Sequence, residues 1–396
     1  RTQQPTVRAT ALTRAARQAR VVLSAPVRLE LGPTRWVLPR YRLAQLLQLP
    51  SNGRRTLRIG GPAADEWLRK LGARIATPPK DATFAVNGPH VRIVPDKPGL
   101  QLDAVRSAAA VLEAALHRLP RLRVAQLVVA EQPAKLTTAK AQAMGIRGVV
   151  SSYETIYGGV ANRIHNVQLV AHLVDDKLIA PGATFSFNKT TGDRNAAKGF
   201  LVAPVIVNGE VTTGLGGGVC QVSTTVFNAA FEAGLKITDR TNHALYISHY
   251  PQGRDATVNY PDVDLKFVND TGHWLLLRTF VGPGSLTVGL YGTPTGRKVT
   301  STTTPLLSRG KPPVKKTVDK TLKPGEKVVD DPGVPAMTTS VTRNVYDRGG
   351  KLLYHNTWYS SYRAVPELVR VGPKKKKKPK QPATTTTTQS PTLPNG

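Results

Sequence analysis

The chain has 396 residues, a formal net charge of +30 and a single cysteine. This length accommodates two or three domains, and one cysteine excludes both an internal disulfide framework and a multi-cysteine zinc site. The cationic surplus favours polyanionic partners, which include nucleic acid, an acidic membrane face and the phosphate-rich polymers of a bacterial wall. We expect no metal and no other cofactor.

The sequence contains no apolar run of the length that a membrane-spanning helix needs, about 18 residues or more. The chain begins at Arg1 and not at a methionine, which is compatible with a processed form. We therefore expect any contact with a membrane to come from an anchor upstream of Arg1.

Residues 1–143 mix the two hydrophobic periodicities and predict a small α+β domain. Asn87-Gly88, between two alternating segments, is a strong hairpin signal. The predicted elements are helices at 10–20 and 102–119 and strands at 26–31, 82–94 and 123–130.

The two ends of this domain resemble each other. Residues 4–15 and 132–143 share a Gln-Pro pair, a Thr-Ala step and a final alanine. One interpretation is that Arg1 lies in the tail of an earlier copy of the same unit, and the other is chance similarity in Ala/Thr-rich sequence.

The segment 67–103, "WLRKLGARIATPPKDATFAVNGPHVRIVPDKPGLQLD", resembles the peptidoglycan-binding modules found beside cell-wall cross-linking enzymes. The resemblance rests on "DATF", the hairpin that follows it, and "PGLQLD" before a helix. It implies wall binding and no chemistry of its own.

Cys220 lies where a glycine-rich turn meets a predicted helix, in a second domain predicted for 151–293. The glycines Gly216, Gly217 and Gly218 precede an apolar stripe at helical spacing, and Gly234 is typical of the helix end. The first turn of a helix lowers the pKa of a thiol through its unpaired N–H groups and its dipole. A thiolate there behind a glycine loop is typical of a nucleophile.

A nucleophilic thiol needs a base and a group that orients it. His243 and then Asp255 follow along the chain, in the order Cys, His, carboxylate that some cysteine enzymes use. The alternatives are a buried small hydrophobe and an anion held at the helix start without chemistry. A zinc site is disfavoured, because no paired cysteines or histidines accompany the thiol.

The block 153–292 resembles the VanW family, which takes its name from a glycopeptide-resistance gene cluster. The resemblance rests on "RIHNVQLVAHLVDDKLIAPGATFSFN", "TGDRNAAKGFLVAPVIVNGEV", "GGGVCQVSTTVFNAAFEAGL", "NHALYISHYPQGRDATV" and "DLKFVNDTGHWLLL", in family order. It implies an exported, envelope-linked protein but no particular reaction. The motif positions are Gly216, Gly217, Gly218, Cys220, Gln221, Ser223, Thr224, His243, Gly253, Arg254, Asp255 and Asn269.

Several side chains around the thiol are candidate ligand-binding residues, with ordinary structural roles as the alternatives. Gln221 is a candidate donor to a developing oxyanion, and Asp193-Arg194 is interpreted as a loop ion pair. The full set of predicted ligand-binding residues is Gly216, Gly217, Gly218, Gln221, Ser223, Arg163, Asn166 and Arg254.

The rest of the chain is predicted to hold a Thr/Pro/Gly/Lys-rich linker at 294–312, a β module at 313–371 and a disordered tail at 372–396. The β module resembles the glycine-marked modules that end wall-associated enzymes and adhesins. The predicted fold class is therefore α+β and multidomain, with a central antiparallel sheet and a cysteine-bearing helix between a small α+β domain and a small all-β domain.

Two functions remain open at this point. The first is an exported cysteine hydrolase or acyltransferase that acts on peptidoglycan peptide amides, with Cys220, His243 and Asp255 as its catalytic residues. The second is a non-catalytic protein that binds peptidoglycan and anionic wall polymers. Nucleic-acid binding is disfavoured, because no recognised motif accompanies the scattered basic residues.

Overall fold

The computed structural model describes residues 9–51, 54–207 and 209–374. The chain divides into two compact units, Arg1–Arg147 and Gly148–Gly396. Each unit combines helices with strands in several sheets, in agreement with the predicted α+β, multidomain class.

The first unit has an apolar core to which its first four helices and several of its short strands contribute. The side chain of Asp103 caps α4 by accepting a hydrogen bond from the Arg106 N–H. The elements are α1 (Ala9–Val22), β1 (Val27–Leu31), β2 (Thr34–Leu38), α2 (Arg40–Leu46), β3 (Leu47–Gln48), β4 (Arg58–Ile59), α3 (Pro62–Ile75), β5 (Thr83–Asn87), β6 (His90–Val94), β7 (Gly99–Leu102), α4 (Ala104–Leu116), a 3-10 turn (Pro120–Leu122), β8 (Val124–Gln126), β9 (Val129–Gln132) and α5 (Thr138–Ala143).

The predicted hairpin is present, since β5 pairs with β6 and Gly88 has a φ of +56°. The echo between 4–15 and 132–143 falls partly on residues 4–8, which lie outside the described residues. The remainder of each copy contributes to a helix, α1 in one and α5 in the other.

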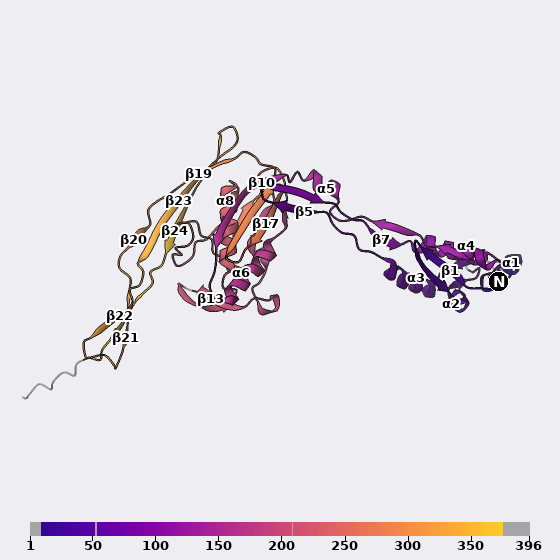
Figure 1. Cartoon of the computed structure of the whole chain (residues 1–396), viewed down its shortest axis with the longest axis horizontal. Coiled ribbons are helices and arrows are strands. Elements are labelled where there is room, and N and C mark those ends of the chain that lie inside the picture. Colours follow the sequence, from indigo (N-terminus) through magenta and orange to yellow (C-terminus); the bar gives the residue numbers. More distant parts are fainter. Residues whose placement is uncertain (1–8, 52–53, 208, 375–396) are drawn as a thin grey trace, which may run out of the picture. The chain divides into compact units, whose positions relative to one another are not determined.

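The second unit is built on an antiparallel sheet with the strand order β11-β17-β18-β10. Helix α8 packs on β10 and β18, and α6 packs on β17 and on α8 (Figure 1). The elements up to β18 are β10 (Gly148–Ile156), α6 (Ala161–Val174), β11 (Lys177–Ile179), β12 (Thr184–Ser186), α7 (Phe187–Thr191), a 3-10 turn (Ala196–Lys198), β13 (Val202–Val207), β14 (Glu210–Leu215), α8 (Val219–Glu232), β15 (Lys236–Asp239), β16 (Lys266–Val268), β17 (Leu275–Val281) and β18 (Ser285–Gly292).

Helix α8 is the centre of this unit. Nearly every side chain from Val219 to Phe231 is buried, so the helix is enclosed and not simply amphipathic. It ends at Glu232, and Gly234 follows with a φ of +66°, as the glycine there predicts. The enclosed helix fixes the position of everything at its first turn.

The last strands form a ribbon that extends the second unit. Strand β23 pairs with β19, β20 and β24, while β25 pairs with β21 and β22. The elements are β19 (Lys298–Thr303), β20 (Leu307–Arg309), β21 (Val314–Val318), β22 (Lys327–Asp331), β23 (Ala336–Tyr346), β24 (Leu352–Tyr362) and β25 (Glu367–Val371).

The segment 294–312 is not the irregular linker that its composition predicts. It contains β19 and β20, and both pair with β23. Its β-branched run "KVTSTTT" fits a pleated strand once a partner strand is available. The predicted disordered tail falls almost entirely on residues 375–396, which lie outside the described residues.

Candidate functional site

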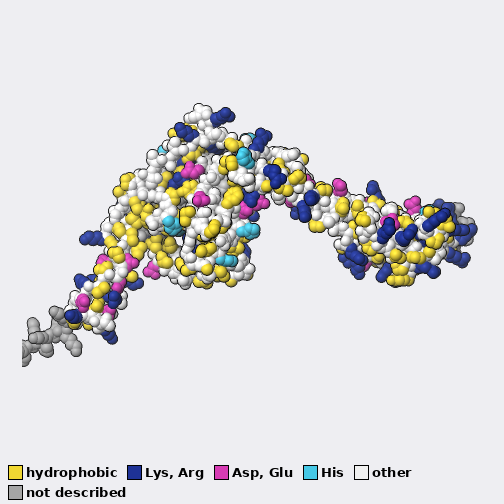
Figure 2. Space-filling view, in the orientation of Figure 1, with side chains coloured by type: hydrophobic (Ala, Val, Ile, Leu, Met, Phe, Trp, Pro, Cys, Tyr) yellow, Lys and Arg dark blue, Asp and Glu magenta, His cyan; other side chains and the backbone are white. Residues whose placement is uncertain are grey.

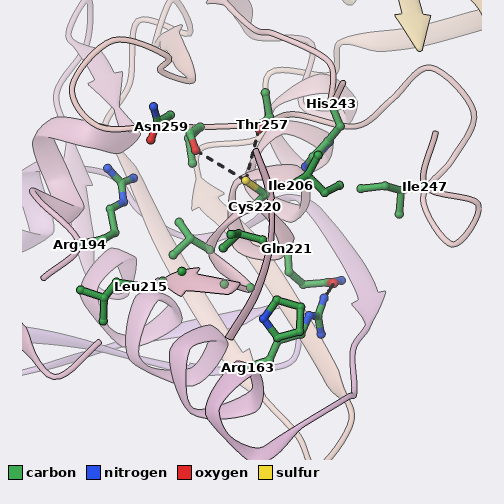
Figure 3. Close-up of a pocket in the computed structure, with 18 of the residues that line it drawn as sticks. Arg163, Arg194, Ile206, Leu215, Cys220, Gln221, His243, Ile247, Thr257 and Asn259 are labelled. Atoms are coloured by element: carbon green, nitrogen blue, oxygen red, sulfur yellow. Dashed lines mark hydrogen bonds between the residues drawn. The ribbon is translucent and has the colours of Figure 1, made fainter. Parts of the chain in front are cut away.

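Cys220 lies in the first turn of α8, directly behind the glycine turn. Gly218 has a φ of +107°, a conformation that L side chains rarely adopt. A Cβ at Gly217 would lie 2.4 Å from the carbonyl oxygen of Pro204 in β13, so glycine lets the turn approach the β13–β14 hairpin. Cys220 is partly buried. It lines a cavity of about 570 Å³ that the same hairpin borders (Figure 3).

The structure brings Cys220, His243 and Asp255 together. His243 and Asp255 lie on the loop between β15 and β16, which an antiparallel bridge between Thr241 and Thr257 closes. His243 Nδ1 is 2.7 Å from Asp255 Oδ2, and the His243 backbone N–H donates to the same oxygen at 2.6 Å. The carboxylate therefore fixes the ring and leaves Nε2 to interact with the thiol. Figure 3 shows His243 beside Cys220.

The environment favours the charged forms of the thiol and the imidazole. Burial raises the pKa of Cys220, but the hydrogen bond and charge of His243 outweigh it and bring that pKa to about 7. Burial lowers the pKa of His243, whereas Asp255 and Cys220 raise it to about 9. Burial raises the pKa of Asp255, but His243 and Arg240 lower it by more than burial raises it. The pKa of Asp255 therefore lies below its ordinary value. The two opposite shifts favour a thiolate–imidazolium pair over the neutral thiol and imidazole.

Two further groups contact the sulfur. The Cys220 Sγ lies 3.4 Å from Thr257 Oγ1 and 3.7 Å from the Val258 carbonyl oxygen. In the part of the chain that the structure describes, the Cys220 N–H has no backbone partner, as expected for the first turn of a helix. This N–H can donate to an oxyanion that forms on a carbon bonded to the sulfur.

Gln221 does not supply the predicted oxyanion donor. Its side chain is buried, and its Nε2 donates to Thr155 Oγ1 at 2.7 Å and to the Ile156 carbonyl at 3.2 Å. Its Oε1 accepts from Arg163 Nη2 at 3.0 Å and from the Tyr250 hydroxyl at 3.2 Å. Gln221 therefore holds Arg163 in the wall of the cavity.

Three other predicted ligand-binding residues support the fold instead of facing the cavity. Asn166 is fully buried and bonds the carbonyls of Leu201 and Gly217 at 2.9 and 3.0 Å, which ties the two ends of the β13–β14 hairpin together. Ser223 is also buried and donates to the Ala256 carbonyl at 2.6 Å. Arg254 bonds Asn228 and Glu232 in the C-terminal part of α8, away from Cys220.

Arg194 is a cavity residue that the sequence analysis interpreted only as part of a loop ion pair. Its Nη2 donates to Asn188 Oδ1 at 2.8 Å, and its Nη1 is buried without a hydrogen-bond partner. Its guanidinium lies 5.8 Å from the centre of the Tyr260 ring. The predicted ion pair with Asp193 is absent from the described residues. No periodicity marks this arginine, so only the folded loop identifies it as part of the cavity wall.

The described residues contain neither a metal-ligand cluster nor a membrane-spanning helix. Among the described residues, no three His, Cys, Asp or Glu side chains gather as metal ligands. Within the same ranges, no helix has the length and apolar character needed to cross a bilayer.

Two parts of the chain match known families. Residues 162–291 match a family described as "VanW like protein", and residues 50–121 match one described as "Putative peptidoglycan binding domain". All three residues of the Cys220 cluster lie in the first match. The predicted resemblances of both segments are confirmed.

Two relatives each match about a third of the chain. The chain is 43% identical over 130 residues to the "Uncharacterized protein YoaR" of Bacillus subtilis (strain 168), a match that covers 33% of this chain and 43% of YoaR. It is 32% identical over 117 residues to the "Vancomycin B-type resistance protein VanW" of Enterococcus faecalis (strain ATCC 700802 / V583), covering 28% and 42%. The chain thus spans less than half the length of either relative.

Two solved structures are also similar in part. The crystal structure of HP0197-G5 is 16% identical, covers 19% of this chain and 97% of its own, and has a TM-score of 0.12. The structure of the IgA1 protease G5 domain is 15% identical, covers 20% and 94%, and has a TM-score of 0.14. Likenesses at these scores carry no functional argument.

Proposed function

Because residues 162–291 form a VanW-like domain and residues 50–121 a peptidoglycan-binding domain, we propose that the protein is an extracytoplasmic, wall-associated thiol enzyme. It is a hydrolase or acyltransferase that acts on peptide amides of peptidoglycan. It resides in the wall or on the outer side of the cytoplasmic membrane, where the first domain keeps the second on its substrate.

One observation carries the proposal: Cys220, which is only partly buried, lines a cavity beside a buried histidine that a carboxylate orients. His243 is 5% exposed and Asp255 is 3% exposed, so little water competes for the hydrogen bond between them. A structural cysteine does not require such a pair. A nucleophile does, because the base must take the thiol proton and hold it until the leaving group needs it.

In the first half of the reaction, the Cys220 thiolate attacks the carbonyl carbon of the amide and forms a carbon–sulfur bond. The carbonyl π electrons move to the oxygen, which accepts a hydrogen bond from the Cys220 N–H. When the carbon–nitrogen bond breaks, the His243 imidazolium gives its proton to the leaving amine. The product is a thioester on Cys220 with His243 neutral.

In the second half, neutral His243 removes a proton from the acceptor, which attacks the thioester carbon. The carbon–sulfur bond breaks and the sulfur leaves as the thiolate, so the ion pair is restored. Water as the acceptor gives hydrolysis, and the amine of a second wall peptide gives acyl transfer. The acceptor alone separates these two outcomes.

Two arginines in the cavity wall agree with an anionic peptide. Arg163 and Arg194 both line the cavity that contains the thiol. Peptides of bacterial walls carry carboxylates, which guanidinium groups bind well. Asp193 also lines the cavity but is exposed, where water weakens its field.

The test is the release of amines from isolated peptidoglycan by the full chain and by Cys220→Ala. We expect the wild-type protein to release new primary amines, or to move them to an added labelled glycine amide, and Cys220→Ala to lose both activities. His249→Ala is the control, because His249 lines the same cavity but contacts neither Cys220 nor Asp255. Equal release by wild type and Cys220→Ala would rule out the thiol mechanism.

Non-catalytic wall binding is the second candidate, and the charge of +30 favours it. Figure 2 shows Lys and Arg side chains scattered over the visible face of each unit, as expected for diffuse attraction to polyanions. Sedimentation with isolated peptidoglycan separates the two modes of binding. Diffuse attraction is lost at about 0.5 M salt, whereas binding by a specific pocket persists.

A further inference from the structure

The loop that carries His243 and Asp255 is held by the end of strand β24, which lies outside the VanW-like segment. Asn242 Nδ2 donates to the Ser361 carbonyl at 2.9 Å, and the Arg363 N–H donates to the Ala244 carbonyl at 2.7 Å. These two bonds flank His243 on both sides in the sequence. His243 therefore lies between two residues, Asn242 and Ala244, that are both hydrogen-bonded to the end of β24 or to the residue after it.

The packing between loop and ribbon is close. A Cβ at Gly253 would lie 2.8 Å from Val341 Cγ2 in β23, so the loop touches the ribbon where only a glycine fits. At the start of the loop, Arg240 Nη1 donates to Ser360 Oγ at 3.2 Å. The ribbon thus forms one wall of the structure that holds the histidine–carboxylate pair.

Tyr362, the last residue of β24, reaches the carboxylate itself. Its hydroxyl donates to Asp255 Oδ1 at 2.8 Å, and its side chain is 2% exposed. Its ring lies edge-on to that of Tyr246, with centroids 5.3 Å apart. Burial and the charge of Asp255 raise the pKa of Tyr362, so the hydroxyl remains protonated and can only donate to the carboxylate.

The four hydrogen bonds to the Asp255 carboxylate divide between its two oxygens. Oδ2 accepts both bonds from His243, while Oδ1 accepts from Tyr362 and from Arg240 Nη2, the latter at 3.1 Å. The donors on Oδ1 fix the plane of the carboxylate. That plane determines whether Oδ2 points at the imidazole.

We propose that Tyr362 is a positioning residue for the thiol chemistry, acting through Asp255 on His243, so that the C-terminal β ribbon completes the site. This inference rests on the proposed function for its importance but not for its test. A residue that only stabilised the fold would affect the melting temperature. A positioning residue also changes the hydrogen bond between His243 and Asp255.

The test uses the full chain with ¹⁵N-labelled histidine. The proton between His243 Nδ1 and Asp255 gives a low-field NMR resonance that reports the hydrogen bond directly. We expect Tyr362→Phe, which keeps the ring and loses the hydroxyl, to move this resonance upfield or broaden it through exchange with water. Tyr246→Phe makes the same chemical change in the neighbouring ring and should leave it unchanged.

If Tyr362→Phe fails to fold, a ring-fluorinated tyrosine at position 362 replaces it, because fluorine strengthens the hydroxyl as a donor with little added volume. The resonance should then move with the fluorinated residue at 362 and stay in place with the same residue at 246. An unchanged resonance in the 362 variant, or equal shifts at 362 and 246, would overturn the proposal.

Where peptidoglycan cleavage is measurable, Tyr362→Phe should lower kcat about 10-fold, as expected for one lost hydrogen bond to a charged group. The two proposals fail separately. If the resonance does not move in the variant at position 362, Tyr362 has no positioning role, whatever the activity of that variant. Full activity of Cys220→Ala removes the thiol mechanism, whatever the resonance does.

Discussion

Replacement of His243 by alanine is the sharpest perturbation of the thiol. In the folded protein the pKa of Cys220 is about 7 because His243 outweighs the effect of burial. Without the imidazole, burial still raises the pKa of Cys220, and the hydrogen bond and charge that lowered this pKa are lost. The pKa of Cys220 should therefore rise to that of a free thiol, about 8.5, or above it.

The magnitude depends on two opposing effects. At pH 7 a thiol of pKa about 7 is roughly half ionised, and one of pKa about 8.5 is roughly 3% ionised, a fall of about 16-fold. Each thiolate of the higher pKa is more nucleophilic, by about 5-fold for a Brønsted coefficient near 0.45. The alkylation rate at pH 7 should thus fall only about 3-fold, so the midpoint of the pH profile is the better observable.

The assay is alkylation of Cys220 by iodoacetamide in the folded full chain, from about pH 5 to pH 10. The single cysteine makes every modified thiol assignable. We expect a midpoint of about 7 for the wild type and of about 8.5 or more for His243→Ala. His249→Ala should keep the wild-type midpoint. A wild-type midpoint near 8.5, or one that His243→Ala does not move, would refute the ion pair.

Asp255→Asn should place the alkylation midpoint between those of wild type and His243→Ala, since the imidazole stays while the group that raises its pKa is lost. Because the folded pKa of Asp255 lies below its ordinary value, wild type should lose stability as pH falls below about 4, and thermal unfolding of Asp255→Asn should show a smaller loss. Arg194→Met should raise KM for peptidoglycan peptides about 10-fold with the alkylation midpoint unchanged; an unchanged KM would remove Arg194 from substrate binding. Gly217→Ala should destabilise the second unit by about 1–3 kcal/mol through a backbone clash, measured by thermal unfolding, and Gly158→Ala, where a Cβ meets nothing within 4 Å, should not.

Local patterns in the sequence predicted the position of Cys220 on its helix well. Glycines before an apolar stripe, with Gly234 after it, define a helix whose first turn contains Cys220, and the structure has α8 there. Such signals act over a few residues and need no tertiary partner. The order of His243 and Asp255 along the chain only suggested that they join Cys220, and the fold of the loop between β15 and β16 is what brings them together.

Side-chain roles set by distant contacts could not be predicted. Asn166 and Ser223 were predicted to bind ligand, yet both are buried and bonded to backbone carbonyls of other segments. The segment 294–312 was predicted to be a linker, because β propensity has little meaning until a partner strand is known. Tyr362 lies in a different part of the sequence from the thiol, and no spacing rule connects it with Asp255.

The bonds between β24 and the 240–255 loop have a practical consequence for protein production. A fragment ending at Gly292, the last residue of β18, would keep Cys220 and α8. It would lose the hydrogen bonds from the end of β24 to the loop that carries His243 and Asp255. Inhibitor screening or crystallisation with such a piece would examine an incomplete candidate site. Any shorter fragment meant for these purposes has to run through β24 and β25 to Val371.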